Sequence, residues 1–531
     1  MDPAPAPAPD AKPSAVTELF ASLVVFMVAL PLCIGIAQAC HLPPEAGLLT
    51  GIVGGLVVGT LAGSPLQVSG PAAGLIVLVV QYLDDAQTKA PQYEKVQLLG
   101  LALVLAGLIQ LTAGALRLGR WFRAVTPAVV EGMLAGIGLT ILAKQFYELL
   151  DDKAPKAIFD ALAGIPECVT KAFVPPAESN ANHSEAAVIG LVALLIMALW
   201  KPLAPKKLKL IPAAVVAVLA GVVINEFGRP VFEALGARIG PAVDDHGGIG
   251  VERVKVSANL FAAVRPVFEL NWEALALPFV WKGAITFALI ASAETLLCSV
   301  AVDSKHTGPR TQYDRELAAQ GVGNVICGAL GALPMTGVIV RSAANVEAGA
   351  RTRWSAVMHG GWLLLFVLVL PGLLSRIPET ALAAVLVFTG WKLLNLPGLW
   401  HLWKENRTEA FVFVLTAGTI VATDLLAGVV TGLLLSMFVL LIRFSHLEVK
   451  REEPAAGEVV LHFKGAATFI RLPVIAQELD SLPQGLRVQL NLAAVQLIDH
   501  AVLHLLLGFQ KQYELTGGTV AIDWGAGRGP A

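Results

Sequence analysis

The chain has 531 residues, of which 56% are hydrophobic and only 15% are charged, and its mean hydropathy is +0.69. Soluble proteins carry roughly 25% charged residues, so this composition excludes an ordinary soluble protein and predicts a chain that lies mostly in a lipid bilayer. The formal net charge of −2 and the lack of a long basic segment give no reason to expect a nucleic-acid partner. The five cysteines show no CxxC or Cys/His spacing, so neither a disulfide framework nor a metal site is expected, and no cofactor is predicted.

A Pro-Ala-rich tail opens the chain, and we expect it to be disordered over residues 1–15, since it lacks the basic start and apolar core of a signal peptide. Fourteen apolar runs follow, each long enough to cross the hydrocarbon layer or half of it. The first seven lie near residues 19–39, 46–62, 71–83, 96–115, 127–147, 186–200 and 210–226. The second seven lie near 277–300, 316–333, 338–347, 355–371, 380–394, 409–423 and 425–443. The sequence therefore predicts an α-helical polytopic membrane domain at 16–445, with repeats at about 16–230 and 275–445.

Every second connection between these runs is basic. The residues concerned are Arg117, Arg120 and Arg123; Lys201, Lys206, Lys207 and Lys209; Lys305, Arg310 and Arg315; Arg351 and Arg353; and Lys404 and Arg407. By the positive-inside rule, both termini are expected in the cytoplasm of a cell whose inner (plasma) membrane holds the chain. The two long connections, roughly 148–185 and 227–275, would face outward, and neither carries a motif that we can interpret.

The third run of each half is unusually short and opens in a turn rich in Gly, Pro and Ser. These turns are Gly63–Pro71 and Gly331–Gly337. Short, interrupted segments at matching places in two halves are typical of a 7+7 inverted repeat with a binding site between its discontinuous third and tenth segments. The alternative is a pair of ordinary helices kinked at proline.

The character of the sequence changes after Arg443, where a Glu/Lys-rich stretch is interpreted as a linker. Beyond it we expect a small soluble α/β domain at 455–531. Its predicted elements are strands at 459–463 and 486–492, a helix at 501–513 and a strand at 519–522.

The two half-helices would begin near Ala72 and Val338, with free backbone N–H groups and positive dipole ends toward the middle of the membrane. Such a pair can bind an anion without a fixed charge. Arg341 adds a cation to the second turn, and a charge at that depth is a functional candidate by default. The alternative is that Arg341 snorkels to the interface or pairs with an acid for structural reasons.

Glu294 lies well inside the eighth run, with no Lys or Arg within a helical turn. A carboxylate so placed could exchange a proton, or could bind Na⁺ when ionised. The alternative is a permanent ion pair with Arg341. Glu131 is interpreted as a residue at a helix start or in a gating contact, and Asp303 and Asp424 as caps at the ends of runs.

No Walker sequence, HExxH motif, nucleophile elbow or Gly-rich dinucleotide turn is present, so neither ATP-driven transport nor enzyme catalysis is expected.

Several motifs in fixed order make the chain similar to the SulP family of anion transporters over nearly its whole length. They are Leu42–Gly47, Gly70–Pro71, Ala293–Leu297 with Asp303, Glu316–Asn324, Pro334–Gly337, Arg341–Asn345, Gly349–Thr352, Ile377–Pro378 and Thr423–Gly428. The resemblance implies fourteen spans in a 7+7 inverted repeat, a core domain that moves against a gate domain, a C-terminal STAS domain and a homodimer.

The resemblance also implies the site residues. The anion would contact the backbone near Ala72 and Ala73 and near Val338, Ile339, Val340, Arg341 and Ser342, and Glu294 would be the coupling acid.

Departures from the family pattern limit which anion and which coupled ion we expect. Leu32 follows Pro31 where many members have Gln, so a polar contact to the anion is lost. The stretches at 29–35 and 334–341 are more similar to the bacterial branch sometimes fused to carbonic anhydrase, which favours bicarbonate. Sodium-coupled members have hydroxyl residues where Cys298 and Ile339 stand, so proton coupling or exchange is at least as well supported as sodium coupling.

The terminal domain resembles a shortened STAS unit, in which a step such as Asp-Ser-Ser usually begins the central helix. This chain has Asp499, His500 and Ala501 there, with no hydroxyl to phosphorylate. We therefore expect a packing or dimer-contact role at that step.

The leading hypothesis is secondary-active transport of a small inorganic anion by alternating access, with bicarbonate slightly ahead of sulfate. The coupled or exchanged ion would be H⁺, Na⁺ or another anion. The alternatives are an uncoupled anion channel and a nucleobase permease of the same architecture.

Overall fold

The computed structural model describes residues 14–119, 126–155, 157–173, 183–205, 208, 211–228, 251–254, 272–423, 425–455 and 457–525. It forms two compact units, Met1–Gly432 and Leu433–Ala531. Some features predicted from the sequence lie outside the described residues. They are most of the N-terminal tail, Arg120, Arg123, Lys206, Lys207, Lys209, Asp424 and most of the loop at 227–275.

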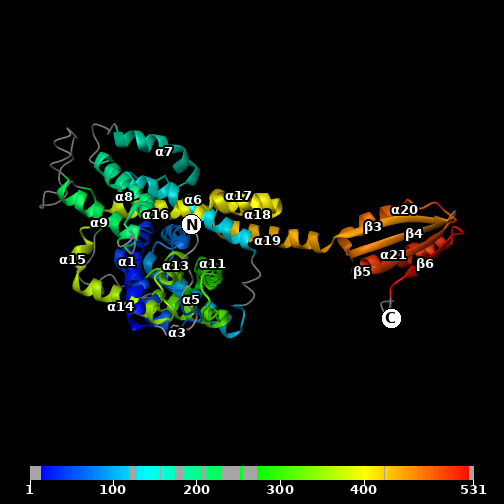
Figure 1. Ribbon diagram of the computed structural model, residues 1–531, viewed down its shortest axis with the longest axis horizontal. Coiled ribbons are helices and arrows are strands. Elements are labelled where there is room, and N and C mark those ends of the chain that lie inside the picture. Colours follow the sequence, from blue (N-terminus) through cyan, green and yellow to red (C-terminus); the bar gives the residue numbers. More distant parts are fainter. Residues whose placement is uncertain are drawn as a thin grey trace. The chain divides into compact units, whose positions relative to one another are not determined.

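Helices account for nearly all of the first unit (Figure 1). The first half contains α1 (Ala15–Ala39), α2 (Pro44–Val53) continued by η1 (Gly54–Val58) and α3 (Gly59–Leu61), β1 (Ser69–Pro71), η2 (Ala73–Leu75), α4 (Ile76–Lys89), α5 (Lys95–Ala115), α6 (Pro127–Leu149), α7 (Ile158–Phe173), α8 (His183–Leu203) and α9 (Ala213–Phe227). The second half contains η7 (Trp272–Ala276), α11 (Pro278–Asp303), α12 (Tyr313–Ala329), β2 (Met335–Gly337), α13 (Ile339–Glu347), α14 (Trp354–Val369), α15 (Pro371–Leu374), α16 (Glu379–Leu394), α17 (Leu396–Glu405), α18 (Arg407–Ala422) and α19 (Leu425–Phe444).

Each of the fourteen predicted apolar runs has a helix at its place, which confirms the polytopic fold. Among the described residues, eight helical stretches are long and apolar enough to cross a bilayer unaided. The third and tenth segments are discontinuous, as predicted, because each is a short strand followed by a half-length helix. Helix α7 was not predicted, since it lies in a loop that we interpreted as carrying no motif.

The helices of this unit pack into two bundles. The first bundle contains α1, α2, α4, α5, α11, α12, α13 and α14, and the second contains α6, α8, α9, α16 and α18. Small residues allow close packing within the first bundle, since a Cβ on Gly107 of α5 would stand 2.6 Å from the Gly321 carbonyl oxygen of α12. The bundles meet mainly where α1 lies along α16 and α9, and they also meet where α4 and η2 touch α6.

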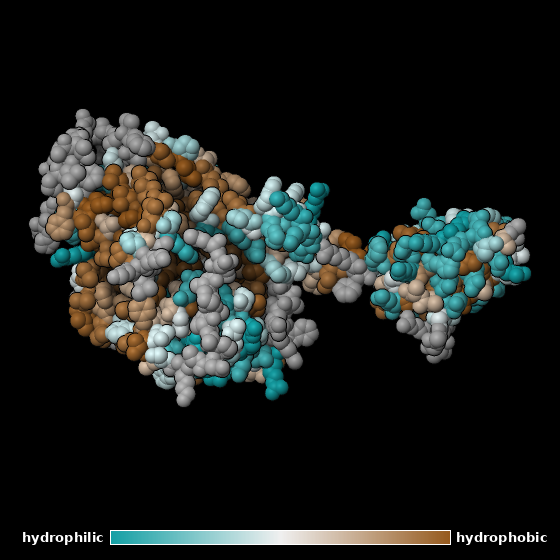
Figure 2. All heavy atoms as spheres, in the orientation of Figure 1, coloured by the Kyte–Doolittle hydropathy of each residue, from teal (hydrophilic) through white to brown (hydrophobic). Residues whose placement is uncertain are grey.

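Large apolar side chains remain exposed on the outside of the helical unit, as a lipid-facing surface requires. Figure 2 shows them as an extensive hydrophobic surface. Examples are Leu195, Leu199, Trp281, Leu365, Leu368 and Phe411.

The second unit is a four-stranded sheet of order β3-β4-β5-β6 with two helices, and it fits a STAS domain. Its elements are β3 (Leu447–Ala455), β4 (Glu458–Ala467), η8 (Phe469–Arg471), α20 (Leu472–Asp480), β5 (Arg487–Ile498), α21 (His500–Glu514) and β6 (Thr519–Asp523). Strands β3 and β4 are antiparallel, and the other neighbours are parallel. Its core includes Leu461, Phe463, Leu490 and Leu506.

One prediction for this region is wrong. The charged stretch after Arg443, interpreted as a linker, contains strand β3. The strand lies at the edge of the sheet and most of its side chains are exposed. Charged residues are common on edge strands, where they block pairing with further strands. Because of these charged residues, the stretch lacks the alternation of apolar and polar residues by which a strand is identified in a sequence.

Candidate functional site

Two half-helices start from a short antiparallel crossing of β1 and β2, in which Ser69 pairs with Gly337, Gly70 with Thr336 and Pro71 with Met335. The pairing continues for one more residue, because the Val338 N–H donates to the Val68 carbonyl (2.9 Å). Since each strand ends where its half-helix begins, the N-terminal turns of α4 and α13 are held close to each other.

The backbone at this crossing is partly accessible. Ala72 is buried and Ala73 is half-buried, while Val338 and Ile339 are half-buried and Val340 is 44% exposed. The first turns of helices carry N–H groups without intrahelical partners. The predicted contact residues therefore lie together at the crossing, and those at the start of α13 are the more accessible.

The Ser342 side chain has a different position from the one expected of an anion ligand. It is fully buried, and its hydroxyl donates to the Val338 carbonyl (2.8 Å) and accepts from the Val68 N–H (2.9 Å). Ser342 thus joins the first turn of α13 to the segment before β1, and it braces the crossing.

Arg341 is fully buried in the first turn of α13. Within the described part of the chain, its guanidinium nitrogens have no hydrogen-bond partner, and no carboxylate lies at ion-pair distance from them. The guanidinium lies against the backbone of Gly70 and close to the Cys33 thiol. The proposed permanent ion pair with Glu294 is therefore not formed in this structure.

The Glu294 carboxylate points at the start of α4. A Cβ on Gly74 of η2 would stand 2.7 Å from Oε1 and 2.9 Å from Oε2, so the carboxylate occupies the space that a side chain at position 74 would need. The neighbouring Thr295 accepts from the Gly337 N–H (3.1 Å) through its hydroxyl. Helix α11 thereby places the Glu294 carboxylate beside the start of α4. The same helix also supports strand β2, which precedes α13.

A buried polar network lies beneath the crossing, and sequence reasoning missed its role. Glu316, which is fully buried, accepts from the Ser64 N–H (2.9 Å) and from the side-chain amides of Gln67 (2.9 Å) and Gln320 (3.0 Å). Asn324 accepts from the Met335 N–H (2.8 Å). The motif Glu316–Asn324 was noticed as a family signature, and the spacing of its polar residues at helical intervals was the signal that could have revealed the network.

Glu131 and Asp303 have the positions predicted for them. Glu131 lies near the start of α6, where its carboxylate accepts from the Asn395 side-chain amide at 3.5 Å. Asp303 ends α11 and accepts from the Thr311 hydroxyl (2.9 Å) and N–H (3.2 Å).

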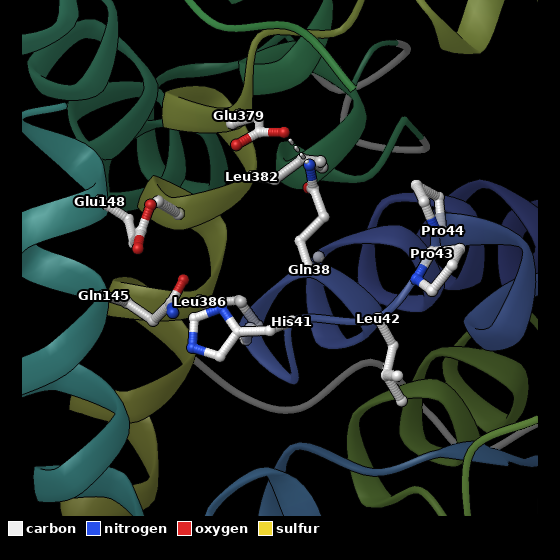
Figure 3. A pocket seen from close by; sticks show the side chains of 13 residues that line it. Gln38, His41, Leu42, Pro43, Pro44, Gln145, Glu148, Glu379, Leu382 and Leu386 are labelled. Atoms are coloured by element: carbon white, nitrogen blue, oxygen red, sulfur yellow. Dashed lines mark hydrogen bonds between the residues drawn. The ribbon is translucent and has the colours of Figure 1, made fainter. Parts of the chain in front are cut away.

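Two cavities lie between the bundles, along the same three helices α1, α6 and α16. The apolar pocket, of about 300 Å³, reaches the crossing at Ile339 and Val340, and Lys392 lies at its edge. The acidic pocket, of about 420 Å³, is lined by polar side chains, which Figure 3 shows around the cavity. These side chains are Gln38, His41, Gln145, Glu148 and Glu379.

An apolar contact between α1 and α16 lies in the lining of the acidic pocket, on the side of α1 nearer to the apolar pocket. On α1, the apolar pocket touches Leu32 and the acidic pocket touches Gly35, which is three residues further on. A Cβ on Gly35 would be 3.5 Å from Leu386 and 3.6 Å from Leu382, so α1 and α16 are nearly in van der Waals contact here. The two pockets share no lining residue.

A sequence profile described as the sulfate permease family matches residues 16–416. The putative sulfate transporter YvdB of Bacillus subtilis is 28% identical over 451 residues, which cover 83% of this chain and 78% of that protein. The bicarbonate transporter BicA of a Picosynechococcus strain is 24% identical over 440 residues, covering 82% of this chain and 71% of BicA. The structure of the murine anion transporter Slc26a9 in the inward-facing state has a TM-score of 0.72 at 17% identity, covering 97% of this chain and 86% of that one.

Proposed function

The chain belongs to the sulfate permease family, and from this premise we propose that it carries bicarbonate, in preference to sulfate, across the membrane by alternating access. Membership establishes a multi-pass membrane anion transporter rather than an enzyme, and it does not favour the nucleobase-permease alternative. The observation that carries the proposal is the β1–β2 crossing, from which two half-helices start, the second of them beside an accessible pocket.

The anion would bind where the two N-terminal turns meet, near Ala72 and Ala73 on one side and Val338, Ile339 and Val340 on the other. Free N–H groups and two helix dipoles stabilise a negative charge there. Arg341 would act through its field, since its buried guanidinium has no counter-ion among the described residues and charges interact strongly at low dielectric. Ser342 would hold the α13 turn in place rather than touch the anion.

The two pockets support a carrier rather than a channel. The apolar pocket touches Ile339 and Val340 at the crossing, whereas no residue of the crossing lines the acidic pocket, and this difference supports a site that is reached from one end at a time. Movement of the first bundle along the second would close one pocket and open the other. With both termini in the cytoplasm, as the basic connections indicate, the apolar pocket would face the cytoplasm and the acidic pocket would face outward.

Glu294 is proposed as the coupling acid, and H⁺ or a counter-transported anion is favoured over Na⁺. Sodium prefers several oxygen ligands. Near Glu294, however, the Thr295 hydroxyl is bonded to the Gly337 N–H, and the next residue on the same helix face is Cys298, whose sulfur lies 3.7 Å from the Ser342 hydroxyl. We also propose a homodimer, from the family resemblance.

Uptake of labelled bicarbonate and sulfate into proteoliposomes, with pH and Na⁺ gradients imposed separately, tests this function. We expect saturable uptake that bicarbonate inhibits more strongly than sulfate and that responds to the pH gradient or to an internal anion. If folded protein takes up neither anion under any gradient, the proposal is wrong. Currents of channel size without saturation would support the uncoupled channel instead.

A further inference from the structure

Helix α17 connects α16 to α18, and none of its residues is buried (Figure 1). It is a helix of its own rather than a continuation of α16, because Asn395 between the two has a left-handed backbone (φ 41°, ψ 48°). Asn395 ends α16 and also begins α17, where its side-chain oxygen accepts from the Gly398 N–H (3.3 Å). The chain therefore changes direction at the end of α16 and continues as a short exposed helix.

The large apolar side chains of α17 share one face, since they recur at the three- and four-residue intervals of a helical stripe. They are Leu396, Leu399, Trp400 and Trp403. Leu396, Trp400 and Trp403 are 49%, 63% and 48% exposed. His401 and Glu405 lie on the opposite face, where the His401 Nε2 is 3.2 Å from the Glu405 carboxylate. The described part of the chain thus leaves an apolar face of α17 uncovered.

The neighbours of α17 in the chain indicate what covers this face. Helices α16 and α18 both occupy apolar runs of a multi-pass membrane domain, so the helix between them lies at a surface of the bilayer. Trp is enriched at that level, and helices with a Leu/Trp face and basic residues lie in the plane of the interface. The surroundings of α17 therefore favour lipid as the occupant over a second protein.

Basic side chains border the apolar face. The Lys404 Nζ lies 5.1 Å from the centroid of the Trp400 ring, so its stem follows an aromatic side chain while its ammonium extends outward, as lysines do at membrane interfaces. Arg407 follows at the start of α18 and is exposed. Among the described residues, no carboxylate lies at ion-pair distance from Lys404 or Arg407. Both cations are thus available to an anionic group outside the chain.

We propose that α17 binds the bilayer through its apolar face, and that Lys404 and Arg407 bind the phosphate groups of acidic phospholipids there. Basic side chains beside a membrane helix are attracted to an anionic leaflet, and both Lys and Arg bind phosphate oxygens through charge-assisted hydrogen bonds. With the basic connections in the cytoplasm, as proposed above, the lipids would belong to the cytoplasmic leaflet.

The lipid contact also has a consequence for transport, which rests on the proposed function. Asn395 donates its side-chain amide to the Glu131 carboxylate on α6 (3.5 Å), and both residues line the apolar pocket together with Lys392. A lipid-bound α17 would hold this end of α16 at a fixed depth while the first bundle moves. We therefore expect faster anion uptake in vesicles that contain acidic phospholipid than in vesicles of phosphatidylcholine alone.

The first measurement locates α17 relative to lipid in the full-length protein. The five natural cysteines are all buried, so a thiol-reactive fluorophore selects an introduced cysteine. Leu396→Cys labels the apolar face and Glu405→Cys, on the opposite face, is the matched control. In vesicles of phosphatidylcholine and phosphatidylglycerol, we expect lipids that carry a nitroxide near the headgroup to quench the label at position 396 strongly and the label at position 405 weakly.

The second measurement tests the headgroups by thermal unfolding of the full-length protein in detergent, titrated with short-chain phosphatidylglycerol or phosphatidylcholine. A ligand that binds only the folded state raises the Tm with its concentration. We expect phosphatidylglycerol to act at the lower concentration, and Lys404→Gln and Arg407→Gln each to raise the concentration needed by about fivefold, as about 1 kcal/mol per basic residue implies. Lys511→Gln, at an exposed lysine in the last turn of α21, is the control and should respond as the wild type does.

The inference is overturned by equal quenching at positions 396 and 405, by an equal response to the two lipids, or by an unchanged response in both basic-residue variants. Disulfide formation between two copies of the Leu396→Cys protein without quenching by lipid would also overturn it, and would show that a second copy covers the face. Size-exclusion profiles establish that each variant is folded.

The inference and the proposed function can fail separately. If quenching and the lipid response are as expected but the protein transports no anion, the proposed function fails while the lipid contact stands. If anion transport is normal and neither measurement detects lipid at α17, only the inference fails.

Discussion

The Glu294 carboxylate lies where a side chain on Gly74 would have to be, with Oε1 2.7 Å and Oε2 2.9 Å from the position of a Cβ. Gly74 belongs to the turn that starts the first half-helix, and Glu294 belongs to α11. A change at either residue would therefore alter the distance between the acidic group and the half-helix N-terminus.

Gly74→Ala should move the Glu294 carboxylate away from the start of α4. Overpacking of this kind costs about 1–3 kcal/mol, and we expect a fall of about tenfold or more in the rate of anion uptake, the factor that 1.4 kcal/mol represents. Combining it with Glu294→Asp, which shortens the side chain, should recover part of the loss. Gly361→Ala is the control, since a Cβ there meets nothing within 4 Å, and an equal loss in that variant would contradict the explanation.

Gln38 and Glu379 form a hydrogen bond between the two bundles, on α1 and α16 (2.8 Å). If the bundles move against each other during transport, a covalent link at this point must stop them. Gln38→Cys combined with Glu379→Cys should lose uptake when a short thiol reagent joins the two residues, and regain it after reduction when the link is a disulfide. Each single variant treated in the same way is the control. Full transport by the linked protein would rule out this relative motion.

Ser342→Ala should weaken the crossing rather than remove an anion ligand. The substitution leaves the Val68 N–H without its acceptor in a buried place, at a cost of about 1–3 kcal/mol. We expect a lower Tm and a reduced maximal uptake rate with a nearly unchanged KM for the anion. Ser304→Ala, at an exposed hydroxyl at the end of α11, should change neither. A large rise in KM without loss of stability would show that Ser342 contacts the anion directly.

Asp499 should stabilise the C-terminal unit through two backbone contacts. Its carboxylate accepts from the Val502 N–H (2.9 Å), which caps α21, and from the Phe469 N–H across the sheet edge. Asp499→Ala should cost about 1–2 kcal/mol and speed amide hydrogen exchange in α21 of the full-length protein. Asp480→Ala at the exposed end of α20 is the control. Unchanged exchange in α21 would contradict the capping role.

The membrane architecture could be predicted from the sequence because its signals are local. A run of apolar residues identifies a span, and the Gly/Pro/Ser-rich turns before residues 72 and 338 identify the half-helices. Glu294 and Arg341 were selected as candidates for the same reason, as charges within apolar runs. In each case one short stretch of sequence holds the whole signal.

The acidic pocket could not be predicted in this way. Gln38, Gln145 and Glu379 lie more than a hundred residues apart, at the ends of helices where polar residues are common, and only packing brings them together. The direction of the Arg341 side chain could not be predicted either. It depends on Gly70, a residue of the other half-helix segment, because a side chain at position 70 would occupy the place of the guanidinium. Strand β3 was missed because exposed charges hide its period.

The measurement that tests the central claim most directly compares Glu294→Gln with the wild type in two assays on the same proteoliposomes. One assay is net uptake of labelled bicarbonate driven by a pH gradient, and the other is exchange of labelled for unlabelled bicarbonate at equal pH. If the half-helix crossing binds the anion and Glu294 couples it to protons, the variant should lose gradient-driven uptake and keep exchange. Unchanged gradient-driven uptake in Glu294→Gln would contradict the account.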